Sequence, residues 1–150
     1  IDKMIWGVSQ YSATFNEGDL FAPDKYLTDY YTDEALKVIE NNKNRPFFLY
    51  LSHWAIHNPL QALRSDVEQM SHMEGHNLQV YSGMIAALDR SVGEVVQKLK
   101  ELDIHGKTLI IFTSDNGGAN YIELDDINKP YRGWKISFFR KYSSNVISIF

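Results

Sequence analysis

Hydrophobic positions along this chain fall into two kinds of pattern, short continuous runs and a longer stretch in which they recur every three or four residues. The continuous runs are residues 47–52 (FFLYLS) and 108–112 (TLIIF), which are rich in aromatic and β-branched side chains and bounded by turn residues. Short runs of this composition are typical of strands that are covered on both faces in a parallel sheet. The pattern therefore predicts two buried strands.

A helix is predicted ahead of the first strand, beginning at Thr32. The Thr32 hydroxyl is a helix-capping group, and Asp33 and Glu34 follow it in the first turn, where carboxylates complement the helix dipole. Asn41 and Asn42 mark the predicted end, because Asn is common where a helix stops.

The periodic stretch predicts a second helix, which begins near Leu78 and ends around Asp103 to Gly106. Its apolar side chains alternate at steps of three and four: Leu78, Tyr81, Ile85, Leu88, Val92, Val95, Leu99 and Leu102. Such spacing also suits a helix that pairs with another helix in a coiled coil. Small residues such as Ala86 and Ala87 widen the face, however, which favours a helix that lies across a sheet. The polar residues 60–77 are predicted to form a loop.

This order of strand, loop, helix and strand has a topological consequence. A strand–helix–strand crossover makes the two strands parallel, so their carboxyl ends lie at one edge of the sheet. His53 and His57 follow the first strand, and Asp115 and Asn116 follow the second. Open α/β sheets bind ligands at this edge. We therefore expect these four side chains to lie close together.

The second strand ends in the sequence SDNGG, where Asp115 and Asn116 supply a carboxylate and an amide oxygen. Both are hard donors of the kind that divalent cations such as Ca²⁺ or Mg²⁺ prefer. Gly117 and Gly118 allow a steep turn after them. The sequence DNG is also an ordinary turn signal, so the motif by itself leaves both interpretations open.

His57 and Lys135 are the other candidate site residues. Asn58-Pro59 disfavours a helix around His57, which places that residue on an extended loop, where it is either functional or simply bonded to the backbone. Lys135 follows Gly133 in a loop and is either a solvated lysine or the positive group that a site for an anionic ester requires.

Composition narrows the possible functions. The 150 residues carry a net charge of −4 and a pI near 5.7, which gives no support to nucleic-acid binding. Apolar runs fall short of the ~18 residues of a membrane span. The chain has no cysteine, which excludes disulfides and thiolate metal sites. It opens with IDKMIWGVSQ, without an initiator Met or a secretory signal, and we expect it to be an internal piece of a longer protein.

Three segments in order resemble the sulfatases, in particular the arylsulfatase and glycosaminoglycan-sulfatase branch of the alkaline phosphatase superfamily. They are RPFFLYLSHWAIHNPLQ, YSGMIAALDRSVGEVVQKLKELDIHGKTLIIFTSDNGG and NKPYRGWK. The resemblance implies an α/β fold, an alkaline-phosphatase-like three-layer sandwich with a mixed, largely parallel sheet, incomplete in this chain. It also implies hydrolysis of sulfate monoesters with bound Ca²⁺, or alternatively Mg²⁺, and a formylglycine nucleophile made from cysteine or serine.

Position by position, the resemblance assigns roles to four residues. Asp115 and Asn116 match the family's paired metal ligands, whereas His57 and Lys135 match the residues that contact the sulfate and can protonate the departing alkoxide. Ile56 stands where the family more often has proline. His53 matches no functional residue of the family.

The sequence lacks parts of the family pattern, and these departures limit the activity that we expect of this chain. A CxPxR or SxPxR nucleophile segment and the amino-terminal acidic pair that completes the metal shell are both missing. The similarity is clearest over residues 20–139, so we interpret 1–139 as a partial sulfatase catalytic domain and 140–150 as a divergent tail. The resemblance therefore implies a chain without turnover of its own, whose substrate class is a sulfated sugar or aryl sulfate ester.

Two other interpretations stay open. A phosphoesterase or phosphomutase of the same superfamily would share the scaffold but would prefer histidine after the aspartate to hold zinc, where this chain has Asn116. A non-catalytic module that binds sulfated ligands is the other. Secreted, periplasmic or lysosomal localisation is expected from the family, and the oligomeric state stays open.

Overall fold

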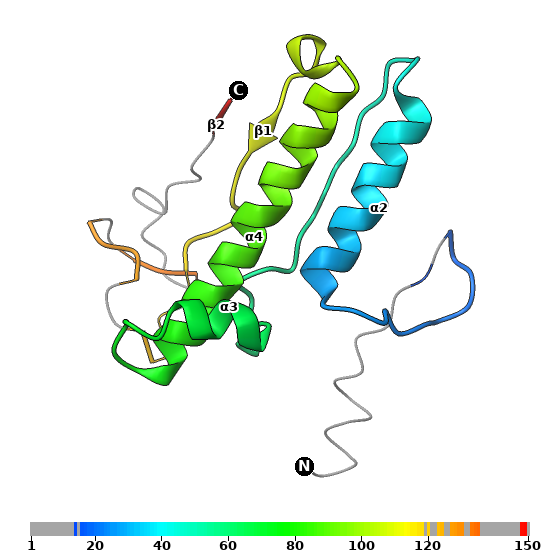
Figure 1. Cartoon of the computed structure of the whole chain (residues 1–150). Helices are drawn as coiled ribbons and strands as arrows, with labels where there is room; N and C mark the ends of the chain where they lie inside the picture. The colour runs from blue at the N-terminus through cyan, green and yellow to red at the C-terminus, as the bar shows by residue number, and fades with distance from the viewer. Residues whose placement is uncertain are drawn as a thin grey trace.

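A computed structural model describes residues 14, 16–118, 120, 123–124, 127–130, 133–135 and 148–149. The elements follow in the order α2 (Leu27–Asn42), α3 (Arg64–Gln69), α4 (His76–Glu101), the 3₁₀ helix η1 (His105–Lys107), β1 (Ile111–Phe112) and β2 (Ser148–Ile149). Helices α2 and α4 pack together, and α3 lies against α4 (Figure 1). Across these described ranges, no helix combines the length and apolar character needed to span a bilayer.

Helix α2 begins earlier than the sequence predicted. It starts at Leu27, so the prediction that Thr32 caps the helix is wrong, whereas the predicted end at Asn42 is confirmed. Thr32 lies in the buried face instead, and its hydroxyl donates to the Thr28 carbonyl at 2.7 Å. The capping signal was misleading because a hydroxyl inside a helix can bond to its own backbone four residues back.

Helix α4 confirms the long periodic stretch, running from His76 to Glu101. Its inner face contacts α2 and α3 through buried residues Val80, Tyr81, Gly83, Met84, Ala87, Ser91 and Leu99. At Gly83 a Cβ atom would lie 3.3 Å from Ala62 Cβ and from backbone atoms of Asp66 and Val67. The missing side chain therefore allows α3 to lie close to α4.

Helix α3 lies inside residues 60–77, which the sequence predicted as a loop, and that prediction is wrong for 64–69. Asp66 is 3% exposed, and its two carboxylate oxygens accept from Arg90 at 2.9 and 3.1 Å. A six-residue helix is too short to show a clear period, and this one is held by a contact that is distant in sequence.

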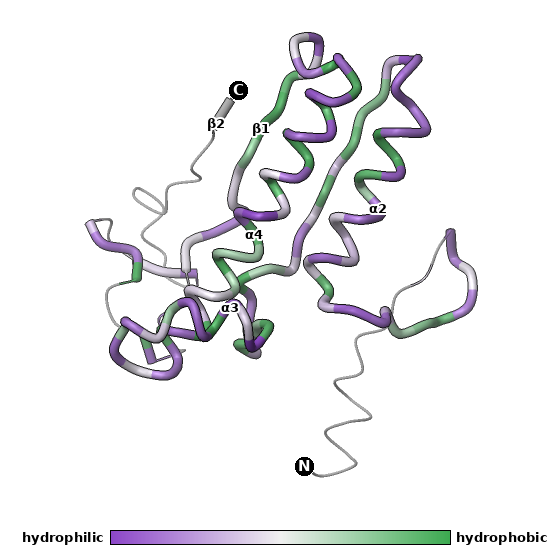
Figure 2. The backbone as a smooth tube through the Cα atoms, viewed as in Figure 1, coloured by the Kyte–Doolittle hydropathy of each residue, from purple (hydrophilic) through white to green (hydrophobic). Residues whose placement is uncertain are grey.

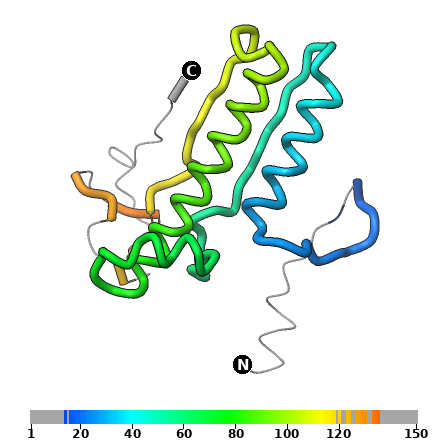
Figure 3. Tube along the Cα trace, in the orientation of Figure 1, coloured from blue at the N-terminus to red at the C-terminus, as the bar shows by residue number. Residues whose placement is uncertain are grey.

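The two predicted strands are extended, but only one of their faces is covered. Residues 47–52 and 108–112 run as apolar segments alongside the helices (Figures 2 and 3). Phe48 is 91% exposed and Tyr50 is 78% exposed, whereas Phe47, Leu49 and Leu51 between and beside them are half-buried. The prediction of strands buried on both faces is therefore wrong for the described chain, because its helices cover only the inner face.

Sheet pairing also differs from the prediction. Strand β1 pairs antiparallel with β2, with Ile111 opposite Ile149 and Phe112 opposite Ser148. No ladder joins residues 47–52 to β1 in the ranges given above, so the predicted parallel pairing is not observed. Strand β2 falls in the predicted divergent tail, and residues 140–147 and 150 of that tail lie outside the described residues.

Candidate functional site

A tight turn follows the extended segment 47–52 and positions His57. The His57 backbone N–H donates to the Trp54 carbonyl at 3.1 Å, and Ile56 between them has φ +64°. A β-branched residue with positive φ is an outlier that costs on the order of 1–3 kcal/mol. Proline, whose ring fixes φ near −65°, cannot adopt this conformation.

Two hydrogen bonds define the state of the His57 ring. Nδ1 lies 2.7 Å from the Asn58 carbonyl oxygen, and the Lys135 Nζ lies 2.8 Å from Nε2. A carbonyl can only accept, so Nδ1 carries the proton and Nε2 presents a lone pair to the ammonium group. His57 is therefore a neutral imidazole that accepts a hydrogen bond from Lys135.

Lys135 is held in place through its backbone. Its N–H donates to the Gly118 carbonyl at 3.3 Å. The Asn128 side chain brackets the same glycine: its Oδ1 accepts from the Gly118 N–H at 2.8 Å, and its Nδ2 donates to the Gly118 carbonyl at 2.9 Å. The loop after β1 and the loop that carries Lys135 are therefore joined at Gly118.

Asp115 and Asn116 occupy the turn between β1 and Gly118. The Ser114 hydroxyl donates to the Asn116 carbonyl at 2.6 Å, Asp115 is exposed and Asn116 is half-buried. Asp115 and Asn116 are linked to the pair formed by His57 and Lys135 through Gly118, whose carbonyl accepts from the Lys135 N–H. Their oxygens suit a hard divalent cation but supply only two ligands. No group of three or more His, Cys, Asp or Glu side chains that could hold a metal occurs among the residues described here.

His53 lies apart from this pair, in a buried polar network between α2 and α4. Its Nε2 is 2.9 Å from the Ser91 hydroxyl, which also bonds to Thr32 at 2.6 Å. Burial lowers the pKa of His53 below its ordinary value. The buried Nδ1 has no hydrogen-bond partner in the described structure. Of the two histidines that follow the first extended segment, only His57 reaches Lys135.

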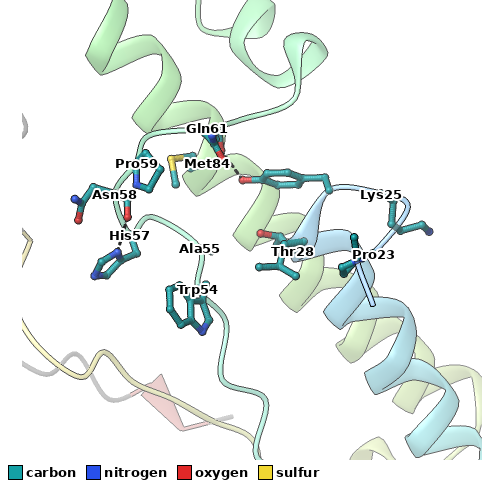
Figure 4. A pocket seen from close by; sticks show the side chains of 13 residues that line it. Pro23, Lys25, Thr28, Trp54, Ala55, His57, Asn58, Pro59, Gln61 and Met84 are labelled. Atoms are coloured by element: carbon teal, nitrogen blue, oxygen red, sulfur yellow. Dashed lines mark hydrogen bonds between the residues drawn. The ribbon is translucent and has the colours of Figure 1, made fainter. Parts of the chain in front are cut away.

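A cavity of about 370 Å³ lies beside the turn (Figure 4). The turn and the residues after it form one wall, and the start of α2 with the residues before it forms the other. The Trp54 ring lines the cavity, and its centroid is 5.8 Å from that of His57. Sequence reasoning overlooked Trp54, although a large aromatic residue three positions before a candidate site histidine was a usable signal.

Comparisons with known proteins agree on one family. The sequence model described as Sulfatase matches residues 2–136. Arylsulfatase J of Mus musculus is 29% identical over 136 residues, covering 89% of this chain. The uncharacterized sulfatase YdeN of Escherichia coli is 33% identical over 132 residues, covering 81%. N-acetylgalactosamine-6-sulfatase of Sus scrofa is 38% identical over 95 residues, covering 62%.

A solved structure shows the same likeness in three dimensions. The crystal structure of Ps i-CgsB in complex with k-i-k-neocarrahexaose superposes with a TM-score of 0.73 and 36% identity, covering 79% of this chain. The matched region is a minor part of each relative. It spans 22% of arylsulfatase J, 24% of YdeN, 17% of N-acetylgalactosamine-6-sulfatase and 26% of the solved chain.

Proposed function

The chain belongs to the sulfatase family, and from this premise we propose that it supplies one part of a site for the hydrolysis of sulfate monoesters. In this proposal His57 and Lys135 bind the sulfate group and handle the proton of the leaving alcohol. Asp115 and Asn116 are ligands of a divalent cation, Ca²⁺ or alternatively Mg²⁺. The substrate is a sulfated sugar or an aryl sulfate ester.

The contact between Lys135 Nζ and His57 Nε2 at 2.8 Å carries the proposal. An ammonium group has three N–H donors, and His57 accepts one of them. The other two are available for the outer oxygens of a sulfate, where a positive donor stabilises the charge that develops during ester cleavage. The pair therefore combines an anion-binding group with a proton acceptor.

The positions of the protons on His57 and Lys135 indicate which residue acts as the acid. Nε2 of His57 holds a lone pair, because Nδ1 already carries the ring proton and donates it to Asn58. His57 in this state has no proton to give from Nε2, whereas Lys135 has one at Nζ. We therefore assign the proton for the departing alkoxide to Lys135, with His57 fixing the direction of the ammonium group.

The donor types of Asp115 and Asn116 fit the expected cation, because a carboxylate and a side-chain amide oxygen are ligands of Ca²⁺ and Mg²⁺. These two residues would hold the cation on the side of the site next to Gly118. When bound, such a cation polarises an ester oxygen as a Lewis acid.

We expect this chain to bind a sulfate ester without turning it over. Its 150 residues include no cysteine and no SxPxR segment, so they offer no precursor of formylglycine. Catalytic residues that act as a unit lose nearly all activity when the nucleophile is absent.

Calorimetric titration with inorganic sulfate in the presence of Ca²⁺ tests the proposal. Lys135→Ala should weaken sulfate binding by about tenfold or more, because hydrogen bonds to a charged group contribute about 1.5–3 kcal/mol. Lys107→Ala is the matched control, since Lys107 is an exposed lysine in η1, outside both loops of the site. Equal sulfate affinity for Lys135→Ala and the wild-type chain would show that the proposal is wrong.

A further inference from the structure

We propose that Trp54 is the platform of a subsite that binds the six-membered ring of the alcohol part of the sulfate ester. The inference rests on the proposed function, because it requires the sulfate group to lie at His57 and Lys135. It goes further by naming the part of the ligand that the neighbouring cavity accepts.

The cavity has the size and surface expected for such a ring. Its volume of about 370 Å³ lies within the range of small-molecule sites, which starts at about 300 Å³. Seven of the thirteen lining residues are apolar: Ala22, Pro23, Leu27, Trp54, Ala55, Pro59 and Met84. An apolar lining suits the flat, non-polar face of a phenyl or pyranose ring better than it suits a second anionic group.

Trp54 offers that ring a surface. The side chain is 58% exposed, although it is large and apolar and lies next to a polar site. Aromatic rings and other flat apolar faces stack on indole, and such contacts contribute beyond the area they bury. Exposed indole beside a sulfate-binding pair is therefore suited to hold the group that the sulfate is attached to.

The turn holds Trp54 and His57 in a fixed relation. Their ring centroids lie 5.8 Å apart at an interplanar angle of 57°, and the Trp54 carbonyl accepts from the His57 N–H. Ile56 keeps a positive φ to close this turn. Strained backbone of this kind is concentrated at functional sites. A ring that stacks on Trp54 therefore lies next to the imidazole.

The opposite wall of the cavity is fixed and carries little free charge. The Tyr26 hydroxyl donates to the Gln61 carbonyl at 2.9 Å, and burial raises the pKa of Tyr26, which keeps this donor protonated. Lys25 lines the cavity but forms a salt bridge with Asp33. Its charge is compensated there, so the subsite favours a neutral ring.

Three ligands separate the ring from the sulfate: inorganic sulfate, galactose 6-sulfate and 4-nitrophenyl sulfate. Each is titrated calorimetrically into the wild-type chain and into Trp54→Ala, Trp54→Phe and Lys135→Ala. Tyr50→Ala is the matched control, because Tyr50 is an aromatic residue, 78% exposed, on the extended segment before the turn. Circular dichroism of each variant confirms that it is folded.

Trp54→Ala should lower the affinity for a ring-bearing sulfate by about five- to tenfold and leave the affinity for inorganic sulfate unchanged. Trp54→Phe should restore most of the loss, since phenyl also stacks, and Tyr50→Ala should have no effect. The ring-bearing ligand that loses more affinity identifies the ring, pyranose or phenyl, that the subsite prefers.

Two results would overturn the subsite while leaving the proposed function intact. One is an unchanged affinity of Trp54→Ala for both ring-bearing ligands while Lys135→Ala weakens all three. The other is an equal loss for inorganic sulfate, which would mean that Trp54 acts only by positioning His57. If Lys135→Ala changes nothing for any ligand, the proposed function fails and the subsite fails with it.

Discussion

The Lys135 ammonium group lies 2.8 Å from Nε2 of His57, although the two residues are 78 positions apart in the chain. The contact joins two loops, one that follows the extended segment 47–52 and one that is bonded through the Lys135 N–H to Gly118, just after β1. Each loop places one polar side chain. Together they give a proton acceptor and a cationic donor at one place on the surface.

The bonding of His57 predicts its tautomer. Nδ1 should carry the proton and Nε2 should not, because Nδ1 faces the Asn58 carbonyl and Nε2 faces the Lys135 ammonium group. Long-range ¹H–¹⁵N correlation spectra of the ring in mildly alkaline buffer measure this directly. His72, which is exposed in the loop between α3 and α4, serves as the reference ring. A protonated Nε2 in the wild-type chain would contradict the assigned geometry.

We predict that Asn128 affects sulfate binding from a distance, by positioning the loop that carries Lys135. Asn128→Ala removes both bonds that bracket Gly118, at 2.8 and 2.9 Å, and each such bond contributes about 1 kcal/mol. The loop that carries Lys135 should then be less fixed, and sulfate affinity should fall by severalfold. Asn120→Ala is the control, because Asn120 is exposed in the same region. Calorimetric sulfate affinities that are the same for both variants would count against this role of Asn128.

Much of the framework could be predicted from the sequence because its signals are local. The period of α4, the end of α2 and the loop placement of His57 all follow from residues within a few positions. The α/β fold of the family is supported by the match over residues 2–136 and by the solved structure, whereas the three-layer sandwich and its largely parallel sheet stay predictions.

The parts that sequence reasoning missed depend on distant contacts. Helix α3 is held by Asp66 and Arg90, and the start of α2 at Leu27 was hidden by a misleading cap at Thr32. The exposure of residues 47–52 could not be predicted, because a buried and a half-covered strand have the same composition when both are apolar. The roles of Asp115, Asn116, His57 and Lys135 in catalysis remain predictions.

The salt bridge between Arg90 and Asp66 predicts that mutation of Arg90 substantially lowers the free energy of unfolding. Arg90→Met leaves the buried Asp66 carboxylate without its two donors, and loss of one partner of a buried pair costs about 3 kcal/mol. Arg64→Ala, which removes an exposed ion pair with Glu68, should cost only about 0.4 kcal/mol. Urea unfolding measures both. Equal losses would show that the contact of α3 with α4 does not depend on this pair.

His53 predicts how stability changes with pH. Burial lowers its pKa in the folded chain below the ordinary value of 6.5, so the unfolded chain binds the proton more readily. The stability that His53 contributes is therefore present above pH 6.5 and is lost as the pH falls below that value. His53→Gln should show a weaker loss of unfolding free energy between about pH 8 and pH 5 than the wild-type chain. His72→Gln, an exposed control, should keep the wild-type dependence, and an unchanged slope in His53→Gln would contradict the prediction.

A double-mutant cycle on sulfate affinity tests the joint action of His57 and Lys135 most directly. The wild-type chain, His57→Ala, Lys135→Ala and the double variant are titrated with inorganic sulfate in the presence of Ca²⁺. If the two side chains act as one pair, the double variant should bind no more weakly than Lys135→Ala, with a coupling energy of about 1 kcal/mol. Fully additive losses, or no loss in either single variant, would contradict a shared site.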